Sequence, residues 1–141
     1  MISAARALVD TGFLVGLISH DDAWHAWAAN AAREVRGPWL TCEACVTEAY
    51  YLLGKISSRD AQKVLAMLDQ GALVSQHLLP DQLANVQAEV ARYHDRLVDF
   101  ADACLMVLSD MHPRLPLVTV DTRDFTVYLR GRGPRRLVAP G

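Results

Sequence analysis

Four acidic residues stand within segments that are otherwise apolar: Asp10, Glu48, Asp102 and Asp121. Burying a carboxylate is costly unless something compensates its charge, and no lysine or arginine is directly adjacent to any of the four. A shared divalent metal is the simplest compensation, and carboxylate oxygens suit Mg²⁺ or Mn²⁺. The pattern therefore predicts a metal-dependent enzyme that acts on phosphate groups.

The composition fits one compact domain spanning residues 1–141, because 52% of the residues are hydrophobic. A formal charge of -2 and a pI of about 6.2 exclude a globally basic nucleic-acid coat, although a local basic patch could still contact phosphates. Three cysteines do not form a disulfide framework, which indicates a reducing, cytoplasmic environment. The apolar stretch 7–18 contains Asp10 and is too short to span a bilayer, so we expect no membrane association.

Apolar runs alternate with helical patterns along the chain, which predicts a parallel sheet covered by helices on both faces. The expected strands are residues 6–10, 39–41, 73–79, 117–120 and, at an edge, 136–138. The expected helices are residues 12–19, 21–35 with Asp21 as N-cap, 42–53, a segment from Ser57 or Ser58 to just before Gly71, 80–94, and 100–111, while residues 124–129 are ambiguous.

This arrangement gives the four acids a common location. Asp10 and Asp121 each end an expected strand, and ligands of open parallel sheets collect beyond the carboxyl ends of the strands. Glu48 and Asp102 need only project from adjoining helices into the same crevice.

The segments that carry these acids resemble those of PIN-domain ribonucleases, specifically the toxins of VapBC-type toxin–antitoxin pairs. The matching segments are residues 8–12 (LVDTG), 46–53 (VTEAYYLL), 99–105 (DFADACL) and 118–125 (VTVDTRDF). The resemblance implies a three-layer α/β/α sandwich with a central parallel sheet, an acidic cluster that binds Mg²⁺ or Mn²⁺, and hydrolysis of RNA. It also implies an antitoxin partner.

The resemblance assigns the first three family acids to Asp10, Glu48 and Asp102. The fourth is either Asp121 or Asp124, and we favour Asp121 because it ends the expected strand. The chain departs from many family members at Gly12, where they carry a serine that supports the metal site.

In the expected reaction, a metal held by Asp10, Asp102 and Asp121 activates water and neutralises charge on the phosphate. Glu48 either completes the metal site or orients the water as a general base. Three further side chains are expected to support the metal ligands: Asp99, Thr11 and Thr119. Asp99 has a simpler alternative role as a carboxylate that stabilises a helix start.

Five arginines lie near the C-terminus: Arg123, Arg130, Arg132, Arg135 and Arg136. They form either a phosphate-binding patch or a solvated surface. Arg123 is the best candidate for substrate binding because it follows Asp121 so closely.

Two other patterns have structural interpretations that we favour. The pair in Cys42-Glu43-Ala44-Cys45 could serve redox or zinc chemistry, but free cysteines usually act as small core residues. The aromatic residues Trp24, Trp27, Tyr50 and Tyr51 are expected in the core or in a homodimer contact rather than as base-stacking platforms.

Two rival functions keep the same fold. One is a non-catalytic PIN-like module that binds a partner protein, which the four filled acid positions disfavour. The other is a DNA-directed nuclease, which the sequence leaves open.

Overall fold

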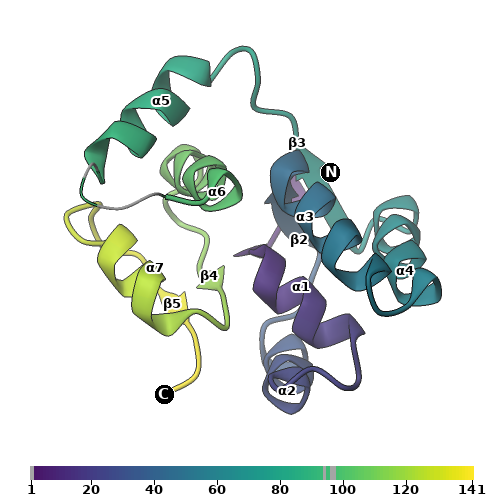
Figure 1. Cartoon of the computed structure of the whole chain (residues 1–141). Helices are drawn as coiled ribbons and strands as arrows, with labels where there is room; N and C mark the ends of the chain where they lie inside the picture. The colour runs from purple at the N-terminus through teal and green to yellow at the C-terminus, as the bar shows by residue number, and fades with distance from the viewer. Residues whose placement is uncertain (1, 94, 96–97) are drawn as a thin grey trace.

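Five parallel strands form a single sheet in the computed structural model, which describes residues 2–93, 95 and 98–141 (Figure 1). Their spatial order is β3 (Leu73–Gln76), β2 (Trp39–Cys42), β1 (Ala7–Val9), β4 (Leu117–Val118) and β5 (Leu137–Val138). The chain builds outward from β1 to β3 and then returns to the other side of β1. The strand order thus reverses between β1 and β4, which is where open α/β sheets bind ligands.

The helices cover the sheet on both faces, so the expected three-layer α/β/α sandwich is confirmed (Figure 1). One layer contains α1 (Thr11–Ile18), α2 (His25–Glu34), α3 (Glu43–Gly54) and α4 (Ser58–Asp69). The other contains α5 (Leu83–Arg92), α6 (Phe100–Met111) and α7 (Thr122–Tyr128), and a 3-10 turn, η1 (Ile2–Ala4), precedes β1. Within the described residues, no helix combines the length and apolar character needed to cross a bilayer.

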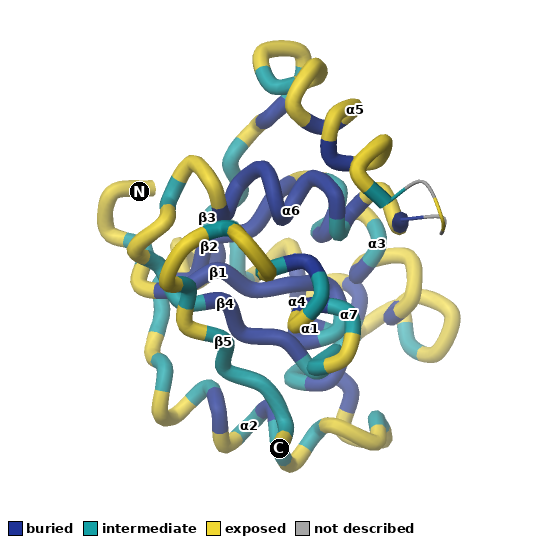
Figure 2. The backbone as a smooth tube through the Cα atoms, turned by 90° about the vertical axis from the view of Figure 1, so that its left-hand side faces the viewer, coloured by how far each residue is buried: buried dark blue, intermediate teal, exposed yellow. Residues whose placement is uncertain are grey.

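Strand β1 shows why the sequence requires two apolar layers. Its three residues are completely buried, and successive side chains of a strand point to opposite faces. Leu8 packs into the core beneath α6, whereas Ala7 and Val9 pack into the core beneath α1 and α3. The continuous apolar run therefore reflects a central strand that is covered on both sides (Figure 2).

Several predicted boundaries are wrong in the first half of the chain. Helix α2 begins at His25, and its N-cap is Trp24 rather than Asp21. The Asp22 carboxylate accepts a hydrogen bond from the Trp24 amide at 2.9 Å, which closes a turn before the helix starts. The strand predicted over residues 73–79 ends at Gln76, where its pairing with β2 stops.

Other boundaries differ in the second half. Helix α5 begins at Leu83 instead of Pro80 and ends at Arg92; its predicted end at His94 lies outside the described residues. Strand β4 pairs only two residues, not the four predicted. Residues 124–128 of the ambiguous segment 124–129 belong to α7, and Leu129 is its C-cap. Because β4 stops at Val118, Asp121 does not end a strand.

Three of the aromatic residues expected in the core or in a homodimer contact are not core residues. Trp24, Tyr50 and Tyr51 are 44%, 43% and 62% exposed. Trp27 is half-buried and packs against the core beneath α1 and α2. The apolar surface left by the three exposed rings is therefore open to a partner.

Candidate active site

Asp10 directly follows β1 and caps α1. Its Oδ1 accepts a hydrogen bond from the Phe13 amide at 2.8 Å, and its side chain is almost wholly buried. The parallel register of Val9 with Val118 brings Asp10 alongside Thr119. The Thr119 hydroxyl donates to Asp10 Oδ2 at 2.5 Å. These two bonds fix the orientation of the Asp10 carboxylate.

The same hydroxyl connects Asp10 to Asp121. Thr119 Oγ1 accepts a hydrogen bond from the Asp121 amide at 2.9 Å, and Thr119 is fully buried. Asp121 caps α7, because its Oδ1 accepts from the Asp124 amide at 3.0 Å. Thr119 therefore ties together two acids from opposite ends of the chain.

Asp102 and Asp99 are supplied by the start of α6. Asp99 caps this helix, since its Oδ1 accepts from the amides of Ala101 and Asp102 at 2.8 and 3.3 Å. Asp99 therefore stabilises the start of α6, which is the simpler of the two roles expected for it. Its charge also helps to raise the pKa of both Asp102 and Glu48, so Asp99 lies within the electrostatic reach of the cluster.

Glu48 projects from α3 and is half-buried. Burial raises its pKa, the Thr11 hydroxyl lowers it, and Asp99 raises it further. Thr11 Oγ1 is itself buried and, among the described residues, makes no hydrogen bond of ordinary geometry. Thr11 therefore lies close to Glu48.

The electrostatics show that the acids share one site. Burial, followed by repulsion from Asp99, Asp10, Asp121 and Glu48, raises the pKa of Asp102 to about 8. Burial also raises the pKa of Asp10 to about 6, although the bonds from Thr119 and Phe13 oppose the change.

Asp121 and Asp124 differ in which acids they act on. Asp121 contributes to the raised pKa of both Asp10 and Asp102. Asp124 acts on Asp121. Burial raises the pKa of Asp121, whereas the Asp124 amide and Arg123 lower it.

The donor set suits a hard cation, because it consists of carboxylate oxygens and the buried Thr11 hydroxyl. Among residues 2–93, 95 and 98–141, no three His, Cys, Asp or Glu side chains lie close enough to hold a metal as they stand. Asp10 and Thr119 are fixed by hydrogen bonds, whereas Glu48 and Asp121 are only half-buried. The donor atoms are therefore of the kind that binds a cation, but the side chains do not form a closed metal site.

Gly12 leaves space that a neighbouring side chain fills. A Cβ atom at this position would lie 2.9 Å from Val120 Cγ2 and 3.9 Å from both carboxylate oxygens of Asp10. A serine here would therefore require Val120 to shift, and its hydroxyl would lie close to Asp10.

The C-terminal arginines do not form one phosphate-binding patch. The side chains of Arg132 and Arg135 are buried in ion pairs. They are therefore part of neither a phosphate-binding patch nor a solvated surface, the two alternatives expected from the sequence. Arg123, Arg130 and Arg136 are exposed. Arg123 remains beside the acids, because its charge lowers the pKa of Asp121.

The three cysteines lie together beside the site as buried thiols. Cys42 Sγ lies 3.6 Å from Cys45 Sγ. A hydrogen bond with Cys104 is the largest cause that raises the pKa of Cys42 to about 12, and the same hydrogen bond lowers the pKa of Cys104. Their interpretation as small core residues fits this environment.

The sequence does not single out Phe100, although 52% of it is exposed beside Asp99 and Asp102. An aromatic residue between two acids at a predicted helix start is a signal that could have identified it.

Comparison with known proteins supports the fold. A family model described as the PIN domain matches residues 7–128. This chain is similar in structure to Mycobacterium tuberculosis VapC20, a toxin that cleaves the Sarcin-Ricin loop, with a TM-score of 0.76. The two sequences are 20% identical, and the match covers 86% of this chain and 94% of the VapC20 chain. No match was found among curated proteins. The family match spans most of the chain, and the chain belongs to the PIN-domain family.

Proposed function

We propose that the protein is an endoribonuclease that hydrolyses RNA phosphodiester bonds with Mg²⁺ or Mn²⁺. The observation that carries the proposal is the gathering of Asp10, Glu48, Asp99, Asp102 and Asp121 at the reversal point of the sheet. In the described part of the chain, no ion pair joins a lysine or arginine to these five acids. Such a cluster is stable only when protonation or a bound cation offsets its repulsion.

We assign Asp10, Asp102 and Asp121 as the residues that hold the cation, with Glu48 and Asp124 as candidates for further ligands. When bound, the cation supplies an activated water molecule and neutralises charge on the phosphate. Glu48 would orient the water and accept its proton at the carboxylate, because burial and Asp99 raise its pKa and so make it a stronger base. Thr119 holds the carboxylate of Asp10, and exposed Arg123 would contact a substrate phosphate.

A cleavage assay with the purified protein tests this proposal. We expect cleavage of end-labelled single-stranded and hairpin RNAs with Mg²⁺ or Mn²⁺, and loss of cleavage with chelator. Asp10→Asn should abolish activity, whereas Asp69→Asn should not, because Asp69 is an exposed acid on α4 outside the cluster. Cleavage of DNA alone would indicate a DNA-directed nuclease, and no cleavage of either polymer would favour the non-catalytic module.

We also propose that the protein acts in the cytoplasm as the toxin of a toxin–antitoxin pair. The similar VapC20 structure is described as a toxin. A basic side chain of an antitoxin could enter the acid cluster, and the exposed Trp24, Tyr50 and Tyr51 could anchor the antitoxin or a second copy of the chain. Expression with and without the neighbouring gene tests the toxin role, and the mass in solution tests the homodimer. Unaffected growth without the neighbour would contradict the toxin role.

A further inference from the structure

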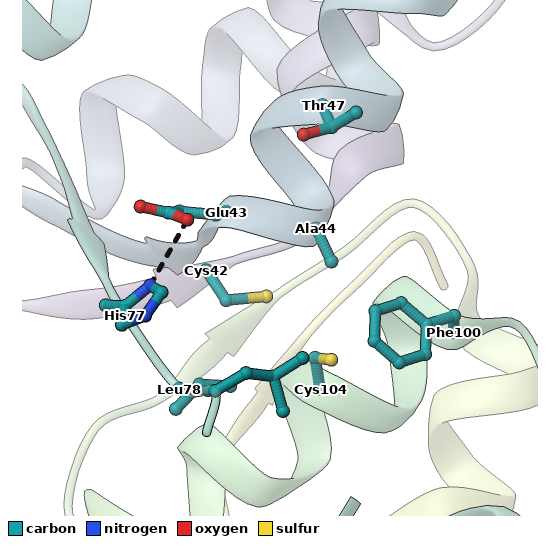
Figure 3. Close-up of a pocket in the computed structure, with 9 residues that line it drawn as sticks. Cys42, Glu43, Ala44, Thr47, His77, Leu78, Phe100 and Cys104 are labelled. Carbon is teal, nitrogen blue, oxygen red and sulfur yellow. Dashed lines mark hydrogen bonds and ion pairs between the residues drawn. The ribbon is translucent and has the colours of Figure 1, made fainter. Parts of the chain in front are cut away.

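A small pocket lies beside the acid cluster, where β2 and β3 end (Figure 3). It has a volume of about 190 Å³. Its walls are mainly apolar and are formed by Cys42, Ala44, Leu78, Leu79, Phe100 and Cys104. Pockets for drug-sized ligands measure roughly 300–1,000 Å³, so this pocket suits one small group rather than a long ligand.

The pocket is continuous with the acid site. Ala44, Thr47 and Phe100 line both this pocket and a neighbouring hollow of about 420 Å³. Glu48 and Asp99 line that second hollow. A polymer that crosses the acids therefore has an adjacent cavity within reach of its next unit.

Phe100 supplies a flat apolar surface at the boundary of the two hollows. It is the first residue of α6, and its ring borders the space between Cys104 and Ala44 in Figure 3. Phe100 is 52% exposed, although Ala101 and residues 103–109 of the same helix are buried. An exposed ring beside a pocket is available for face-to-face contact with another ring.

The surrounding charges select against an anion. The Glu43 carboxylate stands at the rim, 3.3 Å from His77 Nδ1, and is 67% exposed. Glu48 and Asp99 add negative charge in the neighbouring hollow. A phosphate would be repelled at this position, whereas a neutral flat ring would be accepted.

We propose that this pocket binds one unpaired nucleobase of the RNA substrate, next to the scissile phosphate, with Phe100 as the stacking platform. The inference rests on the proposed ribonuclease function and adds a requirement for single-stranded or splayed-out RNA. Stacking of a base on an aromatic side chain changes affinity by about ten- to a hundredfold.

Binding to strands with and without bases tests the proposal directly. The probes are six-residue oligoadenylate, oligouridylate and the matching abasic ribose-phosphate strand, measured by fluorescence anisotropy with Mg²⁺ and the non-cleaving Asp10→Asn protein. We expect the abasic strand to bind about ten- to a hundredfold more weakly than the better of the two base-containing strands. Equal affinity for all three strands would overturn the base pocket, because it would leave only backbone contacts.

Variants of Phe100 separate stacking from apolar bulk. Phe100→Leu keeps an apolar side chain without a ring and should remove most of the preference for bases, whereas Phe100→Tyr should keep it. Trp24→Leu, which alters an exposed ring outside the pocket, should leave the preference unchanged. Ala44→Phe fills the pocket without removing Phe100 and should also weaken base-dependent binding. Unchanged base preference in both Phe100→Leu and Ala44→Phe would exclude the pocket.

Cleavage kinetics keep this inference distinct from the proposed function. For the active protein, Phe100→Leu should raise KM on single-stranded RNA more than it lowers kcat. If Asp10→Asn abolishes cleavage but Phe100→Leu does not change KM, the ribonuclease function stands and the base pocket fails. If no RNA is cleaved but binding depends on bases and on Phe100, the base pocket stands and the ribonuclease function fails.

Discussion

The guanidinium group of Arg132 forms an ion pair with the carboxylate of Glu89, and the two side chains are only 3% and 8% exposed. Arg132 also lies 2.7 Å from Asp110 and donates a hydrogen bond to the carbonyl oxygen of Tyr128. Arg135 adds a second contact to Asp110 at 2.9 Å. These contacts fasten the loop that follows α7 to α5 and α6.

We predict that Arg132→Met lowers the free energy of unfolding by about 3–5 kcal/mol, because it leaves the Glu89 carboxylate buried without a partner. Urea denaturation measures the change. Arg136→Met is the matched control, since exposed Arg136 should contribute less than about 0.5 kcal/mol. Adding Glu89→Gln to Arg132→Met should recover part of the loss. An unchanged urea midpoint for Arg132→Met would show that the pair is not stabilising.

We predict that Thr119→Val reduces activity by about ten- to a hundredfold, because Asp10 and Asp121 lose the hydroxyl that orients them. The buried carboxylate of Asp10 would also lose a hydrogen bond, at a cost of about 1–3 kcal/mol in stability. Thr119→Ser keeps the hydroxyl and should retain most of the activity. If the serine and valine variants cleave RNA equally fast, the hydroxyl has no positioning role.

We predict that the metal-free protein becomes more stable as the pH falls from about 8 toward 5. Burial raises the pKa of Asp10 to about 6 and helps to raise that of Asp102 to about 8. The folded state therefore binds more protons than the unfolded state in this range, and stability decreases as the pH rises. Asp10 alone should contribute about 3 kcal/mol between pH 3.8 and about 6, of which roughly 1.4 kcal/mol falls above pH 5.

Urea denaturation at several pH values, in chelator, measures this dependence. Asp10→Asn should reduce its slope because the amide does not ionise, and Asp69→Asn should leave it unchanged. Added Mg²⁺ should stabilise the protein most at high pH, where the acids are charged. A stability that rises between pH 5 and 8 in chelator would contradict the electrostatic description of the cluster.

We predict that Asp121→Asn costs more activity than Asp124→Asn. Asp121 acts electrostatically on Asp10 and Asp102, whereas the Asp124 carboxyl group interacts with Asp121. Loss of a metal ligand should slow cleavage about a thousandfold, and loss of a supporting group about ten- to a hundredfold. Rates on a common RNA rank the two, and the reverse order would transfer the ligand role to Asp124.

The sequence predicts the layers and the acid cluster because local patterns determine both. The run Ala7-Leu8-Val9 identifies a strand that is buried on two faces, and Asp10 follows it immediately. Features that depend on distant partners are not predictable in this way. Strand β4 pairs only two residues, so Asp121 caps a helix instead of ending a strand. The buried role of Arg132 depends on Glu89, and nothing in the sequence links the two.

The parallel pairing of β1 with β4 also determines when the site can exist. On the ribosome, Thr119 is made 109 residues after Asp10, and Asp121 follows it. A nascent chain that has not yet produced β4 lacks both the hydroxyl that binds the Asp10 carboxylate and the carboxylate of Asp121. The synthesis of β4 therefore sets a built-in delay, and we expect a ribosome-bound fragment ending before residue 117 to be inert toward the RNA that surrounds it.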